Sequence, residues 1–124
     1  MEKEYPLKYL VIKAHRSEYP NPLNLKKSDR ITVGDKYEGP EGWDGWYFCT
    51  IPGHTGGWVP QQIIRRLEGD TGLALEDFTS LELDVDAGDM LIGTRTLNGW
   101  VWCQHLTKGG EGWVPLENLQ SIIE

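Results

Sequence analysis

Two parts of this sequence follow one pattern, and this duplication limits the fold more than any other feature. Three blocks recur in the same order along the chain: 23–31 with 83–91, 45–49 with 99–103, and 57–60 with 112–115. The last pair is identical, Gly-Trp-Val-Pro in both places, and the middle pair begins with Gly-Trp and ends with Cys. Blocks that match in the same order are the signature of an internal repeat. We therefore interpret the chain as two copies of one small structural unit.

The repeats set the expected domain boundaries. The chain has 124 residues, which gives each copy about 55 to 60 residues, close to the lower limit for a self-sufficient core. We expect repeat 1 to span residues 1–67 and repeat 2 to span residues 72–124. The junction at 65–71 is short and charged, and seven extended residues reach only about 25 Å. The two domains are therefore expected to be neighbours in a fixed tandem.

The local pattern of both copies is typical of a small all-β domain. Helix signals are almost absent, and short apolar runs alternate with turns rich in Gly, Pro and Asn. In repeat 2 the pattern predicts strands at 73–75, 90–94, 100–104 and 112–114, and a tight 3₁₀ turn at 116–119 after Gly-Trp-Val-Pro. Repeat 1 follows the same plan with longer loops. We expect two tandem β-barrels of about five strands each.

Charge is distributed unevenly between the two halves. The whole chain has a formal net charge of −7. Residues 1–68 hold ten Lys or Arg against nine Asp or Glu, whereas residues 69–124 hold two against ten. An acidic half favours cations or basic peptides as partners and disfavours nucleic acid, because phosphate contacts need a basic face. It is equally compatible with a solvated surface that binds nothing.

Other classes of function have little support in the residues. No apolar run of about 18 residues is present, so we expect no membrane span. The charged start of the chain is unlike a signal peptide, which makes the cytoplasm the expected location. The two cysteines occupy matching places and are expected to be buried, and neither they nor the three histidines have metal-ligand spacing. Since no nucleophile elbow or phosphate loop is present either, we expect no enzyme, no cofactor and no metal.

The order and spacing of these motifs resemble the SH3 family. In repeat 2, Ala-Leu-Glu-Asp-Phe at 74–78 resembles the opening Ala-Leu-Tyr-Asp-Tyr of that family. The acidic run 82–91 resembles its "Leu-Ser-Phe" and "Gly-Asp-x-Leu" segment. Trp100 stands where the family has the first Trp of a pair, and the block at 112–115 resembles its Gly-Trp-Phe-Pro. Repeat 1 is similar but more diverged.

The resemblance implies a five-stranded barrel that binds extended, proline-rich peptides between aromatic rings, with a carboxylate that pairs with a ligand Arg or Lys. Carried over to repeat 2, it gives the expected peptide-binding residues Phe78, Glu82, Asp84, Trp100, Pro115 and Asn118. Two family tyrosines are replaced, by Glu76 and by Asn118. We therefore expect a groove that is shallower and more acidic than usual and that accepts basic or polar peptides.

Repeat 1 offers a second and poorer groove. It keeps Trp46 and Pro60 at the family's groove positions. It has His15 in place of the second opening tyrosine and Pro22 in place of the carboxylate. Tyr19, in a long loop, is a candidate to rebuild an aromatic surface there; the alternative is that it covers the barrel or packs on repeat 2.

Strand alternation adds a prediction for the outer faces. If Cys103 faces the core, so does Val101, and Trp102 faces the other side. The same phase puts Phe48 on the outer face of repeat 1. Large outward aromatics in a short-linked tandem predict an interface, so we expect Phe48 or Trp102 to pack between the repeats or in a homodimer.

Several functions remain open at this point. The leading interpretation is a non-enzymatic module that binds peptide or protein segments, mainly through repeat 2. The main alternative is a structural or assembly module whose barrels pack together or self-associate without binding a peptide. Recognition of a bacterial cell wall and a Tudor-type methyl-lysine cage rest on fold analogy alone, and the missing export signal counts against the first.

Overall fold

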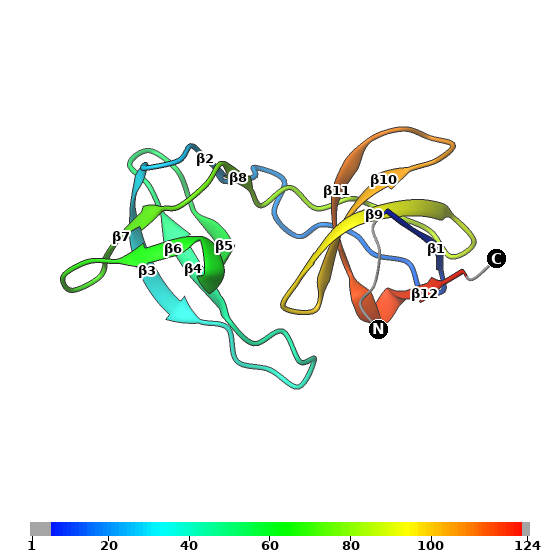
Figure 1. Cartoon of the computed structure of the whole chain (residues 1–124), viewed down its shortest axis with the longest axis horizontal. Coiled ribbons are helices and arrows are strands. Elements are labelled where there is room, and N and C mark those ends of the chain that lie inside the picture. The colour runs from blue at the N-terminus through cyan, green and yellow to red at the C-terminus, as the bar shows by residue number, and fades with distance from the viewer. Residues whose placement is uncertain (1–5, 123–124) are drawn as a thin grey trace. The chain divides into compact units, whose positions relative to one another are not determined.

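The computed structural model describes residues 6–122, which form an all-β fold with two 3₁₀ turns and no α-helix (Figure 1). The first half contains β1 (Leu7–Val11), β2 (Asn24–Leu25), β3 (Arg30–Lys36), β4 (Trp46–Thr50), β5 (Gly57–Pro60), η1 (Gln61–Ile63) and β6 (Ile64–Arg66). The second half contains β7 (Thr71–Ala74), β8 (Phe78–Thr79), β9 (Met90–Leu97), β10 (Trp100–His105), β11 (Glu111–Pro115), η2 (Leu116–Asn118) and β12 (Leu119–Ser121). The predicted 3₁₀ turn after each Gly-Trp-Val-Pro block is confirmed.

The strands form two five-stranded antiparallel sheets and a two-stranded ribbon. The sheet orders are β11-β10-β9-β1-β12 and β5-β4-β3-β7-β6, and the ribbon pairs β2 with β8. Within residues 6–122 the end strands of each sheet do not pair with each other, so neither sheet is closed. The all-β prediction is confirmed, whereas the two closed tandem barrels are not.

The chain folds into two compact units that do not coincide with the two repeats. Unit 1 consists of residues 1–20 and 81–124, and unit 2 of residues 21–80. The expected domains, 1–67 and 72–124, therefore do not describe the compact units. Each repeat gives its opening segment to the sheet of the other repeat.

The exchange of β1 places the start of repeat 1 in unit 1. In Figure 1 this strand (dark blue) lies among β9 to β12 (yellow to red). Tyr9 is opposite Leu91 of β9 on one side and opposite Ser121 of β12 on the other. A strand in the middle of a sheet satisfies its backbone groups on both sides, so β1 is an integral part of this unit.

The exchange of β7 places the start of repeat 2 in unit 2. The predicted strand at 73–75 exists, but it pairs with β3 and β6 of repeat 1. The junction is a tight hairpin between β6 and β7: Leu67 N donates to Thr71 O at 2.8 Å, and Gly69 takes a φ of +58°. The expectation that this junction links two domains is wrong, because a three-residue loop with a left-handed Gly closes a hairpin between neighbouring strands.

Both cores mix residues from the two repeats. In unit 1, Tyr9 and Val11 of β1 are buried with Val85, Leu91, Val101, Cys103, Val114 and Leu119. In unit 2, Ala74 and Phe78 of repeat 2 are buried, as are Leu23, Leu25, Ile31, Val33, Cys49, Val59, Ile63 and Ile64. Burial of apolar area is the main stabilising contribution to such small units. Each unit therefore depends on the exchanged segment for part of its core.

Candidate ligand-binding site

The candidate site lies in unit 1, where the exchanged segment meets the acidic part of repeat 2. His15 Nε2 lies 2.8 Å from Glu82 Oε1, and the two side chains are 15% and 14% exposed. The His15 ring also meets the Trp100 ring edge to face, with centroids 5.4 Å apart and planes at 80°. A half-buried tryptophan, an imidazole and a carboxylate thus share one surface, although His15 and Glu82 are 67 residues apart in the sequence.

Backbone pairing places His15 in this site. His15 N donates to Val85 O at 2.9 Å, and Val85 N donates to His15 O at 3.0 Å. Since Val85 is almost completely buried, this pair anchors the segment after β1. Residues on either side of the pair consequently have fixed directions.

Pro115 and Asn118 are buried residues next to the site. Pro115 is buried and lies opposite Trp100 in the β10–β11 ladder. The buried Asn118 donates from Nδ2 to Lys13 O at 3.1 Å and to Ala14 O at 3.2 Å. Asn118, which was expected to bind peptide, therefore holds the segment that carries His15.

The remaining acidic groups near the site are paired within the chain. Asp84 Oδ1 accepts a hydrogen bond from Ser17 N at 2.8 Å. Asp86 accepts from Arg16 and from Lys108. The hydrogen bond from Arg16 is the main reason that the pKa of Asp86 is lowered, and the same contact raises the pKa of Arg16. These carboxylates are less available to a basic ligand than the sequence predicts.

The exchange also evens out the charge between the units. Unit 1 holds six Lys or Arg against ten Asp or Glu, a formal net of −4, and unit 2 holds six against nine, a net of −3. The strongly acidic second half of the sequence is therefore not a strongly acidic body. Its carboxylates face basic residues that repeat 1 contributes.

Phe78 does not join the residues with which the sequence analysis grouped it. It lies in unit 2, 8% exposed, and pairs with Leu25 in the β2–β8 ribbon. His15 takes the corresponding place in unit 1, since it pairs with Val85 as Phe78 pairs with Leu25. The expected set in repeat 2 is thus divided: Glu82, Asp84, Trp100, Pro115 and Asn118 lie in unit 1 without Phe78.

The second expected groove is divided in the same way. Trp46 and Pro60 are direct cross-strand partners in unit 2, and both are buried. Tyr19 is 40% exposed and belongs to unit 1. The three residues do not form one surface within a unit.

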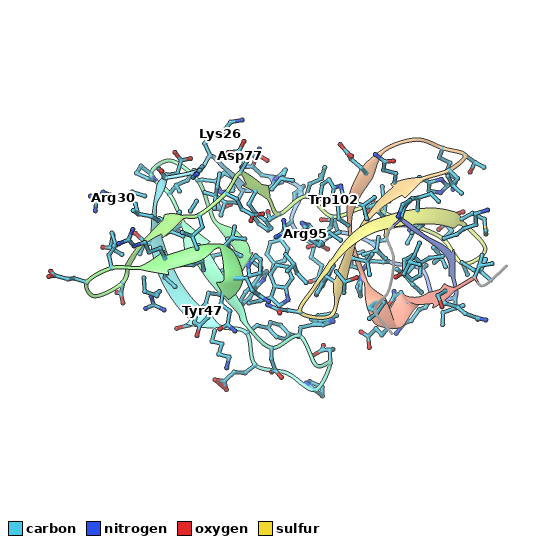
Figure 2. The ribbon with its side chains drawn as sticks, viewed as in Figure 1. Lys26, Arg30, Tyr47, Asp77, Arg95 and Trp102 are labelled. Atoms are coloured by element: carbon cyan, nitrogen blue, oxygen red, sulfur yellow. The ribbon has the colours of Figure 1, made fainter. Side chains whose placement is uncertain are left out.

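Phe48 and Trp102 occupy equivalent places in the two sheets. Each is half-buried and packs edge to face on the Trp of the Gly-Trp-Val-Pro block, Phe48 on Trp58 at 5.2 Å and Trp102 on Trp113 at 5.4 Å. Figure 2 labels Trp102 with Arg95, its partner in the β9–β10 ladder. The prediction that Val101 and Cys103 face the core is confirmed, since both side chains are completely buried. The role of Phe48 or Trp102 in an interface stays a prediction.

The two cysteines are structural side chains. Both are completely buried, and burial raises the pKa of each thiol to about 12. Within residues 6–122 no three His, Cys, Asp or Glu side chains come together as a metal site. No helix in the same part of the chain is long and apolar enough to cross a membrane.

His15, Arg16 and Ser17 were not expected to be parts of the acidic surface. His15 was compared with Phe78, but each was kept in its own repeat. The available signal was Glu-Gly-Asp at 68–70, a short turn between the apolar residues 63–64 and 73–75, which favours a hairpin. A hairpin there requires β7 to stay with repeat 1.

Comparison with known protein families agrees with part of this picture. Residues 8–67 match the family model of the variant SH3 domain. This SH3-type segment runs from β1 to β6, so its first strand lies in unit 1 and the others in unit 2. SH3 domains in general are protein-interaction modules. The match does not extend to repeat 2, so the tandem relationship stays a prediction.

No curated protein and no solved structure matched the chain.

Proposed function

We propose that this protein is a non-enzymatic interaction module that binds an extended peptide or protein segment through unit 1. The observation that carries the proposal is the joint surface of Trp100, His15 and Glu82. A flat, half-buried indole beside a carboxylate suits a polyproline II ligand, which is already extended and loses little entropy on binding. The SH3-type match at residues 8–67 supports this class of function.

The ligand we propose is proline-rich and carries one basic residue. The basic residue would pair with Glu82, whose carboxylate also holds His15 at 2.8 Å. Asp86 already pairs with two basic side chains, Arg16 and Lys108, so further basic residues in the ligand would gain little from it. The second groove and the cytoplasmic location stay predictions.

Titration followed by amide and indole NMR tests the proposal. The ligands are a proline-rich peptide with one Arg and the same peptide with Ala in its place. We expect shifts at the Trp100 indole with both peptides, and tighter binding of the Arg peptide. Glu82→Gln should weaken binding of the Arg peptide about three- to tenfold and leave the Ala peptide unchanged. Glu111→Gln, an exposed carboxylate in the same unit, is the matched control.

Two outcomes would contradict the proposal. Equal effects of the Glu82 and Glu111 substitutions would remove the role of Glu82. No response to either peptide, together with an apparent mass that rises with protein concentration, would favour the structural or assembly module instead.

A further inference from the structure

The two exchanged strands carry residues of opposite size at the same register position. Tyr9 of β1 is opposite Leu91 in unit 1, and Gly72 of β7 is opposite Ile31 in unit 2. Leu91 and Ile31 are matching positions of the two repeats. Tyr9 and Gly72 are therefore equivalent positions, one with a large side chain and one with none.

The residue that faces this position in each unit has the complementary size. In unit 1 it is Gly93, where an added Cβ would lie 2.5 Å from Tyr9 Cε2 and 2.7 Å from Val101 Cγ1. Real Cβ atoms do not come so close, and Tyr9 itself is only 1% exposed. The Tyr9 ring thus occupies space that exists only because position 93 has no side chain.

In unit 2 the sizes are reversed. Val33 is the residue of repeat 1 that matches Gly93, and it is buried. Its Cγ2 would lie 3.1 Å from a Cβ added to Gly72. Each unit therefore contains one large and one small residue at this point, but on opposite strands.

In the alternative arrangement, which we call self-contained, each repeat would keep its own opening strand, and Tyr9 and Gly72 would then meet residues of unsuitable size. Tyr9 would meet Val33, where no space exists for the ring, and Gly72 would meet Gly93, where a void would remain. Overpacking and cavities both destabilise a core. We propose that the pairs Tyr9–Gly93 and Gly72–Val33 select the exchanged pairing and so act as positioning residues that bring His15 to Glu82 and Trp100. The consequence for ligand binding rests on the function proposed above, whereas the selection of the pairing does not.

The β6–β7 hairpin favours the same arrangement, so the experiment must separate the two causes. The variant Val33→Gly/Gly93→Val keeps the amino-acid composition of the chain and the sequence of the β6–β7 hairpin unchanged. It makes the self-contained pairing the one that fits, because Tyr9 then meets a glycine within repeat 1. Adding Tyr9→Gly/Gly72→Tyr makes the exchanged pairing fit again, still at constant composition.

Engineered disulfides report which pairing forms. Leu10 is opposite Gln120 in the exchanged structure. Leu73, at the matching position of β7, is opposite Arg65, so self-contained repeats would place Leu10 opposite Arg65. Directly opposed residues of antiparallel strands are within disulfide range. The reporters are Leu10→Cys with Gln120→Cys and Leu10→Cys with Arg65→Cys, with both native cysteines replaced by alanine.

The expected result is a reversal of the two cross-links. With the unmodified core, the yield of the Leu10–Gln120 disulfide should exceed that of the Leu10–Arg65 disulfide by about tenfold or more. In Val33→Gly/Gly93→Val the Leu10–Arg65 disulfide should be favoured, or the fold should be lost. The four-substitution variant should restore the Leu10–Gln120 disulfide. A Leu10–Gln120 link in all three would show that the hairpin alone decides. Failure of the four-substitution variant to fold would also overturn the proposal.

Two further readouts keep the inference separate from the proposed function. In the unaltered protein we expect a nuclear Overhauser contact between the Tyr9 ring and the Val101 methyl groups, and its absence would refute the exchange. The cross-links need no ligand. If they reverse while peptide binding does not change, the pairing rule holds and the proposed binding site is wrong.

Discussion

The substitution Gly112→Ala tests how closely β11 packs on the backbone of residues 81–83 inside unit 1. Gly112 opens the second Gly-Trp-Val-Pro block and is buried against the backbone of residues 81–83. An added Cβ would lie 2.7 Å from both Glu82 C and Leu83 N. The same backbone is held by two hydrogen bonds, Trp113 N to Leu81 O at 2.9 Å and Leu83 N to Trp113 O at 3.1 Å. Backbone atoms fixed in this way cannot rotate aside as a side chain can.

The cost of the substitution follows from the displacement it requires. Ordinary contact begins near 3.4 Å, so the segment must move by about 0.7 Å. A shift of that size weakens two hydrogen bonds of about 1 kcal/mol each and adds about 1–2 kcal/mol of overpacking strain. The Ala substitution also lowers the entropy of the unfolded chain, which offsets about 0.4–1 kcal/mol of this loss of stability. The net loss is about 2–3 kcal/mol, or a melting temperature roughly 10 °C lower.

Gly57→Ala is the matched control at the same place in repeat 1. The nearest atoms to its Cβ are Ser80 Oγ at 2.8 Å and Leu23 Cβ at 2.9 Å, which belong to side chains. The Ser80 hydroxyl can rotate away, at the expense of its hydrogen bond with Leu23 N. Leu23 Cβ is bonded to its backbone and has to shift by about 0.5 Å, so we expect a loss of about 1–1.5 kcal/mol, smaller than that of Gly112→Ala. Urea or thermal denaturation measures both values. Equal losses, or a Gly112→Ala protein that melts within about 2 °C of the parent, would refute the reasoning.

The remaining predictions concern ionisable groups. Burial raises the thiol pKa of Cys49 and Cys103 to about 12. The folded protein should therefore react with a thiol reagent at pH 8 far more slowly than the unfolded protein. Rapid labelling of either cysteine in the native state would count against this packing. The pKa of Asp86 is lowered, mainly by Arg16, so the stability it contributes is present above its unfolded pKa and lost as the pH falls through its folded pKa. Asp86→Asn should therefore flatten the loss of stability below about pH 4, and an unchanged acid limb in urea unfolding would argue against the pair.

Much of the local structure could be predicted because it depends on short-range patterns. The strands at 90–94, 100–104 and 112–114 and the 3₁₀ turns after each Gly-Trp-Val-Pro follow from alternation and from proline geometry. The burial of Val101 and Cys103 and the half-buried state of Trp102 follow from the two-residue period of a strand. These features do not depend on which strand is the neighbour.

The candidate site could be predicted only in part, because it joins distant segments. Glu82 and Trp100 were found from their own motif, and the structure places them on one surface. Their third member, His15, comes from the other repeat. Phe78 was assigned to the same groove, but it follows β7 into unit 2. An assignment by motif keeps each residue in its own copy, and strand exchange breaks that rule.

The sequence pattern was sufficient to predict two similar sets of short strands, with the same turn after each repeated Gly-Trp-Val-Pro block. Which opening strand completes which sheet depends on contacts between residues far apart in the sequence. Both opening strands pair antiparallel with their sheets in the same register, so the pairing rule proposed above assigns the choice to the hairpin at Gly69 and to how Tyr9 and Gly72 fit the residues they meet. That choice also brings His15 to Trp100 and gives the acidic segment its basic neighbours.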